Sequence, residues 1–167
     1  LMVVSTGFAY LDVDAEDAFG WCAEAMGRIA RKAEQEGVTL AVEPFTKYTT
    51  HICNEASQLR RLLRTVNSPR LMGLADTDVI ATTAVDTFST FLDVIGPENL
   101  GHVHFVDGNP GGHLVPGDGV LDLDGALEKL KAIHYTGALG LEVLDRRYVF
   151  APEAAMKQAM DWYKERI

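Results

Sequence analysis

Short apolar and β-branched runs alternate with longer amphipathic segments along the whole chain. The apolar runs, each typical of a strand, cover residues 2–5, 38–42, 70–75, 101–106 and 138–143. Between and after them, an apolar position recurs every three or four residues, which predicts helices over residues 15–36, 54–66, 84–95, 124–133 and 151–167. Strict alternation of strands and helices is typical of a parallel sheet with helices outside it.

The first predicted helix has the clearest ends. Asp14 is a good N-cap residue, Glu16 and Asp17 place negative charge in the first turn, and Gly37 follows the last helical residue. The apolar positions of this segment share one face of the helix and are Phe19, Cys22, Ala23, Met26, Ile29 and Ala30. We therefore expect this helix to pack one face against the sheet.

The number and size of the units favour one architecture. An open doubly wound sheet usually carries a glycine-rich turn after its first strand, and Ser5-Thr6-Gly7-Phe8 is not such a turn. Five units of about 33 residues would make up the last five strand–helix units of a (β/α)8 TIM barrel, which needs about 250 residues. We predict an α/β fold of this kind in a single domain over residues 1–167. The chain opens on Leu1-Met2-Val3-Val4-Ser5, typical of a strand interior, so we expect the sequence to begin partway through a larger protein.

The composition and net charge of the chain limit the classes of partner that it is expected to bind. The chain has 15 Lys and Arg against 24 Asp and Glu, a net charge of −9, and 47% hydrophobic residues. This is the composition of a globular domain, and the negative charge disfavours nucleic acid as a partner. No apolar run reaches the roughly 18 residues of a membrane span, and two cysteines suit a reducing compartment. We expect a cytoplasmic protein without a membrane or nucleic-acid partner, and a homo-oligomer, because five barrel strands would leave open sheet edges.

Four potential metal ligands stand at the carboxyl ends of predicted strands. Glu43, Asp76, His104 and Glu142 each come from a different strand. Active sites of TIM barrels are built at this rim, so we expect the four side chains to meet there. Each residue alone also has a structural explanation: Asp76, for example, suits the cap of a turn in Asp76-Thr77-Asp78, and buried histidines such as His102 and His104 are often only hydrogen-bonded. Jointly, the four residues favour a metal site.

Three carboxylates and one imidazole suit a hard or borderline divalent ion such as Mn²⁺, Mg²⁺ or Co²⁺. Such an ion can hold the oxygens of a hydroxyketone and stabilise the enediolate formed when the adjacent carbon loses a proton. Two carboxylates acting in turn could then remove a proton from one face and return one to the other, which inverts that carbon. Glu43 and Glu142, from the first and last strands of the set, are the natural pair.

The order of these motifs resembles the xylose-isomerase-like barrel superfamily and its sugar phosphate isomerase/epimerase branch. The resemblance is carried by Leu40-Ala41-Val42-Glu43-Pro44-Phe45, by Gly101-His102-Val103-His104-Phe105-Val106-Asp107 and by Gly140-Leu141-Glu142-Val143. More narrowly, four segments of the chain resemble fructoselysine 3-epimerases. They are Glu43-Pro44-Phe45-Thr46, Cys53-Asn54, Ser68-Pro69-Arg70-Leu71 and His113-Leu114-Val115-Pro116-Gly117-Asp118-Gly119.

This resemblance implies one divalent ion, Mn²⁺ before Co²⁺, Mg²⁺ or Zn²⁺, held by Glu43, Asp76, His104 and Glu142. It implies that Glu43 and Glu142 are the catalytic acid/base pair. It also implies that His113 faces the substrate, which would be a small sugar or sugar amine.

Several positions depart from related families. The multi-zinc DNA-repair endonucleases carry a His at the place of Val79 and an Asp at the place of Gly111, so a three-zinc cluster is excluded here. The ketose 3-epimerases carry a second Glu at the place of Thr49, a His at the place of Val79 and an Arg at the place of Pro110. The mechanism is therefore better predicted than the substrate.

We expect a metal-dependent sugar epimerase or isomerase, and within that class a ketosamine 3-epimerase. An inosose dehydratase or a hydroxypyruvate isomerase would use the same metal–enediolate chemistry, and product analysis separates them. A different alternative is a non-catalytic fragment that acts as an assembly element. Two other candidates are weaker: Cys53, close to a predicted helix start, and the Arg146-Arg147 pair after the last strand.

Overall fold

The computed structural model describes residues 1–166, and these form five strands, six α-helices and two 3-10 turns. The strands are β1 (Met2–Ser5), β2 (Leu40–Glu43), β3 (Leu71–Asp76), β4 (Leu100–His104) and β5 (Leu139–Gly140). The helices are α1 (Ala15–Glu36), α2 (Ala56–Val66), α3 (Thr77–Thr83), α4 (Phe88–Ile95), α5 (Leu123–Ala132) and α6 (Pro152–Lys164). The 3-10 turns are η1 (Pro97–Asn99) and η2 (Arg146–Tyr148).

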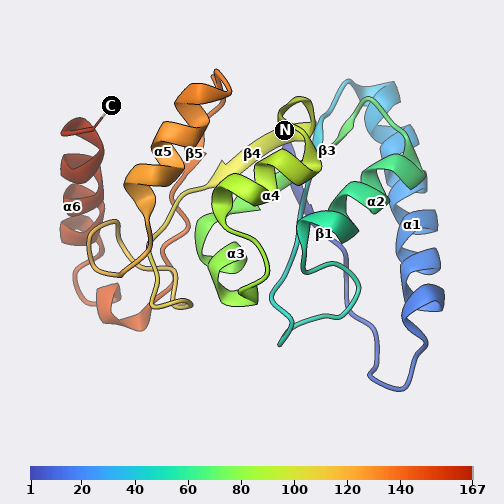
Figure 1. Ribbon diagram of the computed structural model, residues 1–167, viewed down its shortest axis with the longest axis horizontal. Coiled ribbons are helices and arrows are strands. Elements are labelled where there is room, and N and C mark those ends of the chain that lie inside the picture. The colour runs from blue at the N-terminus through green and yellow to red at the C-terminus, as the bar shows by residue number, and fades with distance from the viewer. Residues whose placement is uncertain (167) are drawn as a thin grey trace.

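All five strands are parallel and pair in chain order, β1-β2-β3-β4-β5. Figure 1 shows the helices in a row along the sheet, from α1 at one end to α6 at the other. This sequential, parallel arrangement is that of consecutive units of a TIM barrel, as predicted. Within the described residues, no helix is both long and apolar enough to cross a membrane.

The first helix, α1, begins and ends at the predicted residues. Asp14 accepts hydrogen bonds from the backbone N–H groups of Glu16 and Asp17, and Gly37 ends the helix with a left-handed backbone (φ 68°). The buried face contains Phe19, Cys22, Met26 and Ala30, as the spacing of apolar residues predicts, but Ile29 is exposed.

The core lies between the sheet and its helices, and its centre is formed by α2 and α4. Leu59, Leu62, Phe91, Leu92 and Ile95 are almost completely buried there. Gly73 of β3 makes this close approach possible, because a Cβ at that position would lie 2.9 Å from Cδ2 of Leu59.

The segment predicted as one helix over residues 84–95 is different in the structure. Residues 77–83 already form α3, and Ala84 ends that helix with a positive φ of 57°. A new helix then begins after Thr87, whose hydroxyl accepts from the backbone N–H of Thr90. Two helices form here instead of one because each has its own N-cap residue. Asp76 and Thr87 each accept hydrogen bonds from the free N–H groups at the start of their own helix.

Other predicted boundaries shift by small amounts. The helix expected over 54–66 begins at Ala56, because Asn54 donates its side-chain amide to the carbonyl groups of Phe45 and Thr50. The helix expected over 151–167 is described from Pro152 to Lys164, and Ile167 lies outside the described residues.

The last strand is much shorter than the predicted 138–143. Leu139 and Gly140 pair with Val103 and His104, which end β4, so the following residues have no β4 residue beside them. Leu141 and Val143 pack instead against Val115 and the Ala155 and Ala159 face of α6. Glu142 therefore lies beyond the end of β5 and not within a strand.

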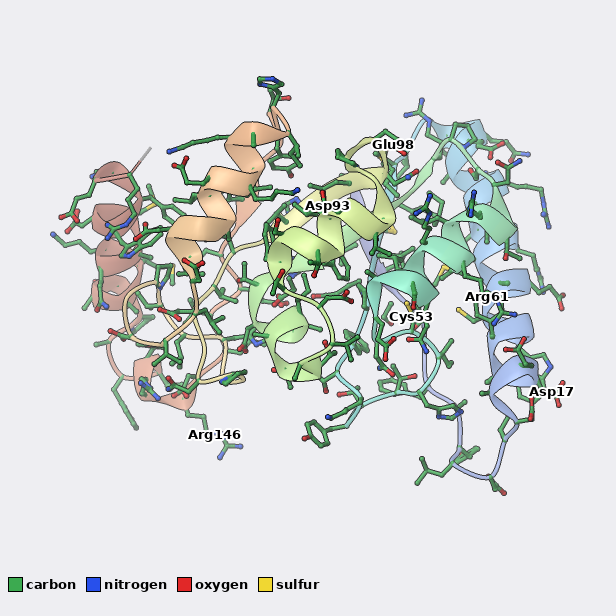
Figure 2. The ribbon with its side chains drawn as sticks, in the orientation of Figure 1. Asp17, Cys53, Arg61, Asp93, Glu98 and Arg146 are labelled. Carbon is green, nitrogen blue, oxygen red and sulfur yellow. The ribbon has the colours of Figure 1, made fainter. Side chains whose placement is uncertain are left out.

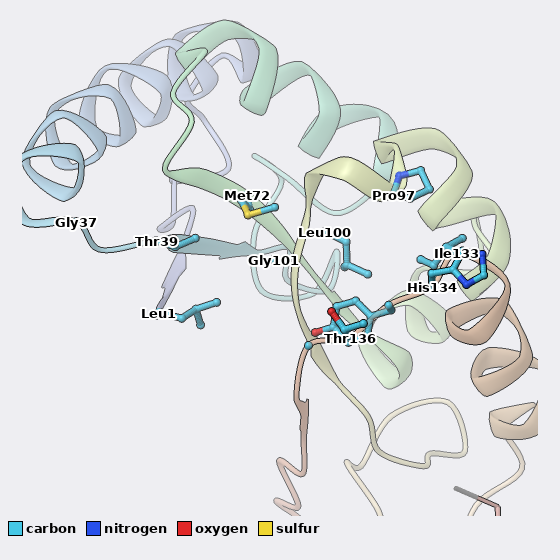
Figure 3. Close-up of a pocket in the computed structure, with 12 residues that line it drawn as sticks. Leu1, Gly37, Thr39, Met72, Pro97, Leu100, Gly101, Ile133, His134 and Thr136 are labelled. Atoms are coloured by element: carbon cyan, nitrogen blue, oxygen red, sulfur yellow. The ribbon is translucent and has the colours of Figure 1, made fainter.

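The amino ends of the strands border a cavity of about 460 Å³ (Figure 3). Its lining includes Leu1, Thr39, Leu100, His134 and Thr136. The loops that follow the strands lie along the opposite edge of the sheet, the lower edge in Figure 1. In TIM barrels the chemistry resides at the carboxyl ends and the amino ends serve stability.

Candidate metal centre and active site

The structure brings the four predicted metal ligands together. Glu43, Asp76 and His104 are the last residues of β2, β3 and β4, and Glu142 comes two residues after β5. One donor atom from each of the four lies within 4.8 Å of the others. We call Glu43, Asp76, His104 and Glu142 the ligand cluster.

Three carboxylates of the ligand cluster converge on one imidazole nitrogen. Nδ1 of His104 lies 3.0 Å from Oε1 of Glu43, 3.3 Å from Oε2 of Glu142 and 3.5 Å from Oδ2 of Asp76. A single ring N–H can donate well to only one of them. The remaining carboxylate oxygens therefore need a further positive partner, and His113, near Asp76 and Glu142, is too far from their oxygens to satisfy them fully.

Asp76 gives the clearest indication of what that partner is. Its Oδ1 accepts from the backbone N–H groups of Asp78 and Val79, both at 2.8 Å, and so caps α3. Its Oδ2 is buried and accepts no hydrogen bond, although the ring nitrogens of His113 and His104 lie 3.3 Å and 3.5 Å away. A buried carboxylate oxygen is costly unless it is paired or coordinates a metal. Asp76 therefore serves both as a helix cap and as a potential ligand, and the oxygen-rich cluster fits a divalent cation.

Nearby charges shift the acid–base behaviour of the cluster. Burial opposes the charge on Asp76, but contacts with His104, His113 and the Val79 N–H hold its pKa at about 2. Burial likewise lowers the pKa of His104, but Asp76 and Glu43 overcome this and raise it to about 10. Burial and the proximity of Glu43 raise the pKa of Glu142.

These shifts predict how the metal-free protein responds to pH. The pKa of His104 rises from 6.5 to about 10 on folding, so its stabilising effect is complete below pH 6.5 and is lost as the pH rises through about 10. For His104 alone, linkage sets the loss of unfolding free energy over that range at about 5 kcal/mol at most, and His113, whose pKa is raised to the same value, acts in the same direction; urea denaturation in the presence of a chelator measures the fall. Asp76 acts in the opposite direction, and its contribution is lost only as the pH falls from 3.8 through about 2.

Saturating divalent metal provides the control. A bound cation would replace the imidazolium as the partner of the carboxylates and flatten the decrease between pH 6.5 and 10. A metal-free protein with unchanged stability from pH 6.5 to 10 would contradict the assigned contacts.

His113, predicted to face the substrate, lies beside the ligand cluster. It belongs to the loop between β4 and α5, and its Nε2 is 3.3 Å from Oδ2 of Asp76 and 3.6 Å from Oε2 of Glu142. Its Nδ1 is 2.9 Å from Oδ2 of Asp78. Burial lowers the pKa of His113, but Asp76 and Asp78 raise it to about 10.

Asp78 is a site residue that the sequence did not reveal. Asp76-Thr77-Asp78 suggests a turn, and nothing in its spacing connects Asp78 with His113, which is 35 residues away. Thr77 was missed for the same reason. Its hydroxyl accepts from the backbone N–H of Val106 and donates to the Val106 carbonyl, which ties the start of α3 to the chain after β4.

Gly140 leaves the space that His104 occupies. A Cβ at position 140 would lie 2.9 Å from Nε2 of His102 and 3.2 Å from Cδ2 of His104, and the two rings already contact each other edge to face. We expect Gly140→Ala to displace His104 and to weaken Mn²⁺ binding about tenfold, measured by calorimetry.

Gly20→Ala is the matched control, since a Cβ on Gly20 of α1 meets no atom within 4 Å. That variant should keep its metal affinity and gain up to about 1 kcal/mol of stability, because alanine favours a helix. Wild-type affinity in Gly140→Ala would show that His104 tolerates the added methyl group.

The weaker sequence candidates lie outside the cluster. Cys53 is buried, and burial, with Cys22 and Glu55 nearby, raises its pKa to about 12, so it is not an activated thiol. Arg146 extends away from the protein at the lower edge of Figure 2. Arg147 pairs with Asp145, the N-cap residue of η2.

Comparison with known proteins agrees with this architecture. The family model described as Xylose isomerase-like TIM barrel matches residues 1–166. The chain belongs to the xylose isomerase-like TIM barrel family. Its parallel sheet and its order of strands and helices are thus those of a family member, as the sequence motifs predicted.

The proteins to which this chain is similar in sequence include epimerases. Fructoselysine 3-epimerase from Escherichia coli O157:H7 is 28% identical over 148 residues, which cover 87% of this chain and 53% of that protein. Ketose 3-epimerase from Arthrobacter globiformis is 30% identical over 118 residues, which cover 71% of this chain and 39% of that protein. The chain thus spans about half or less of the length of these relatives.

Solved structures show the same fold at lower identity. The apo form of 3-keto-D-glucoside 4-epimerase from E. coli matches with a TM-score of 0.85 and 20% identity, over 98% of this chain and 63% of that one. A structure described as the IOLI protein with a binding zinc atom matches with a TM-score of 0.79 and 19% identity, over 95% of this chain and 59% of that one.

Proposed function

We propose that this chain carries the metal centre and the acid/base pair of a divalent-metal-dependent sugar epimerase. The reaction inverts the carbon next to a ketone through an enediolate. The observation that carries the proposal is the ligand cluster itself: three carboxylates converge on His104, and one of their oxygens, Oδ2 of Asp76, is buried without a hydrogen bond. Relatives named as epimerases support the same class of reaction.

The ligand cluster would hold one divalent ion, with Mn²⁺ as the expected metal and Co²⁺, Mg²⁺ or Zn²⁺ as alternatives. Such an ion supplies charge stabilisation for the ketone oxygen as the neighbouring C–H bond breaks. Which of these metals occupies the site depends on the availability of each metal as well as on the geometry of the ligands.

Glu43 and Glu142 perform the proton transfers. They enter the cluster from β2 and from the end of β5, the outermost of the four elements that contribute ligands, and so from its two sides. The carboxylate of Glu43 removes the proton, and the carboxyl group of Glu142 returns one to the opposite face of the carbon. In the metal-free site, burial and the proximity of Glu43 raise the pKa of Glu142.

The charge of the site favours a neutral or cationic sugar. Asp78 adds a fourth carboxylate next to the ligand cluster, so that one divalent ion and a protonated His113 only partly offset the negative charge, and the chain carries a net charge of −9. A phosphate group would be repelled by these charges, whereas the amine of a ketosamine would be attracted. We therefore propose a ketosamine of the fructoselysine type as substrate, with His113 contacting one of its oxygens.

Incubation in D₂O tests the reaction. The Mn²⁺-loaded protein is mixed with a ketosamine and, separately, with free ketoses, and the products are followed by NMR. We expect inversion at C3 with deuterium at that carbon and no loss of water. Loss of water would instead indicate a dehydratase of the inosose type, and movement of the carbonyl group would indicate an isomerase of the hydroxypyruvate type. Bound metal without any C–H exchange would overturn the proposal.

A further inference from the structure

Asp78 is a buried carboxylate that organises the loop between β4 and α5. It is the second residue of α3 and its exposed fraction is 1%. Oδ1 accepts from the backbone N–H of Gly111, and Oδ2 accepts from the backbone N–H of His113 at 3.0 Å. Asp78 is not part of the ligand cluster, so its burial is not explained by metal binding.

The loop is shaped to receive this carboxylate. A Cβ on Gly108 would overlap with Oδ1 of Asp78, so only glycine fits there. Gly111 and Gly112 have φ values of 99° and 110°, and His113 itself has a φ of 47°, a conformation that a non-glycine residue adopts at a cost. Such strain persists only where surrounding contacts impose it, and it is common at functional sites. For His113, the two contacts with Asp78 supply that constraint.

The same contacts fix the direction of the His113 ring. An ionised carboxylate only accepts hydrogen bonds, so Nδ1 of His113, 2.9 Å from Oδ2, must carry the hydrogen that it donates. The opposite nitrogen, Nε2, is thereby turned towards Asp76 and Glu142, at 3.3 and 3.6 Å. A carboxylate that holds one ring nitrogen and so aims the other is a recurrent means of orienting histidines at metal sites.

We propose that Asp78 is the positioning residue of this site, holding the backbone and Nδ1 of His113 so that Nε2 points at the ligand cluster and at a substrate oxygen bound there. This rests on the proposed function for the role of His113, but the Asp78–His113 contact itself does not depend on it. Asp78 acts only through His113 and touches neither the substrate nor the metal.

Nuclear magnetic resonance tests the contact independently of activity. The protein is labelled with ¹⁵N-histidine and loaded with diamagnetic Mg²⁺, and the Nδ1–H resonance of His113 is assigned by its absence in His113→Gln. We expect a slowly exchanging Nδ1–H in the wild type and its loss in Asp78→Asn, because a neutral amide oxygen is a weaker acceptor than a carboxylate and cannot take the place of both carboxylate oxygens. Retention of a slowly exchanging Nδ1–H in Asp78→Asn would overturn the proposal.

Two further variants keep this test decisive. Asp118→Asn alters a carboxylate of the same loop that binds Tyr148 and Gln158 instead, so the His113 signal should stay. Asp78→Ser removes the carboxylate and leaves space for water beside Gly111, so it replaces Asp78→Asn if the latter does not fold. The signal should be lost in Asp78→Ser as well.

Kinetic measurements then test whether Asp78 acts through His113. Asp78→Asn should lower kcat/KM by 10- to 100-fold, the usual effect of removing an orienting partner of a site histidine. In a His113→Gln background the same change should have no further effect beyond about twofold, because the residue through which it acts is gone. A full additional loss in that background would assign Asp78 a purely structural role. Absence of any turnover in metal-loaded wild type would refute the proposed function and leave the resonance result to decide on Asp78.

Discussion

Glu142→Gln is expected to abolish epimerase turnover, with a decrease of at least about 10³-fold in kcat. Glutamine keeps the size of the side chain but cannot deliver or take up a proton, so the carbon is not inverted. It also removes one carboxylate from the ligand cluster, so Mn²⁺ binding should weaken tenfold or more, or about 1.4 kcal/mol. Calorimetry measures the second effect, and NMR detection of the epimer measures the first.

Glu128→Gln is the matched control for this variant. Glu128 is an exposed carboxylate on α5 that pairs, among the described residues, with Lys131, and surface pairs of this kind contribute little. Both turnover and metal affinity should remain at the wild-type level there. Turnover above a tenth of the wild-type value in Glu142→Gln would remove Glu142 from the acid/base pair, and unchanged Mn²⁺ affinity would remove it from the ligand cluster.

Asp107→Ala is expected to cause the largest loss of stability. This buried carboxylate follows β4, and each of its oxygens accepts two backbone hydrogen bonds. Oδ1 accepts from the N–H groups of Gly108 and Leu121, and Oδ2 accepts from those of Gly117 and Gly119. Alanine would leave these donors without their acceptor inside the protein. The free energy of unfolding should fall by about 3 kcal/mol or more, measured by urea denaturation.

The N-cap residue of α1 provides a reference for this loss of stability. Asp14 accepts two backbone N–H groups at the exposed start of α1, and Asp14→Ala should cost only about 1 kcal/mol because water can replace the lost acceptor. Asp107→Asn should fall between the two, since one oxygen remains. A cost for Asp107→Ala no greater than that for Asp14→Ala would mean that the loop from residue 107 to 121 is held by other contacts.

Local signals account for what could be predicted. The ends of α1 were predicted because Asp14 and Gly37 each act on their own turn of helix. The ends of α3 and α4 were not, because Asp76 could equally begin a turn or a helix, and only the pairing of β3 with β2 and β4 fixes where its strand stops. The length of β5 was overestimated for a related reason: an apolar run extends as a strand only where a neighbouring strand is present to pair with it.

The sequence by itself determined the alternation of strands and helices and the four residues of the ligand cluster, because a polar residue at the end of an apolar run is visible in the order of residues alone. The tertiary structure decided how these residues meet. Glu43 and His104 are 61 positions apart, and Asp78 and His113 are 35 apart, so their contacts depend on the register of the sheet and on the path of the loop after β4. No local pattern encodes those distances, since each arises from the packing of segments that are remote along the chain.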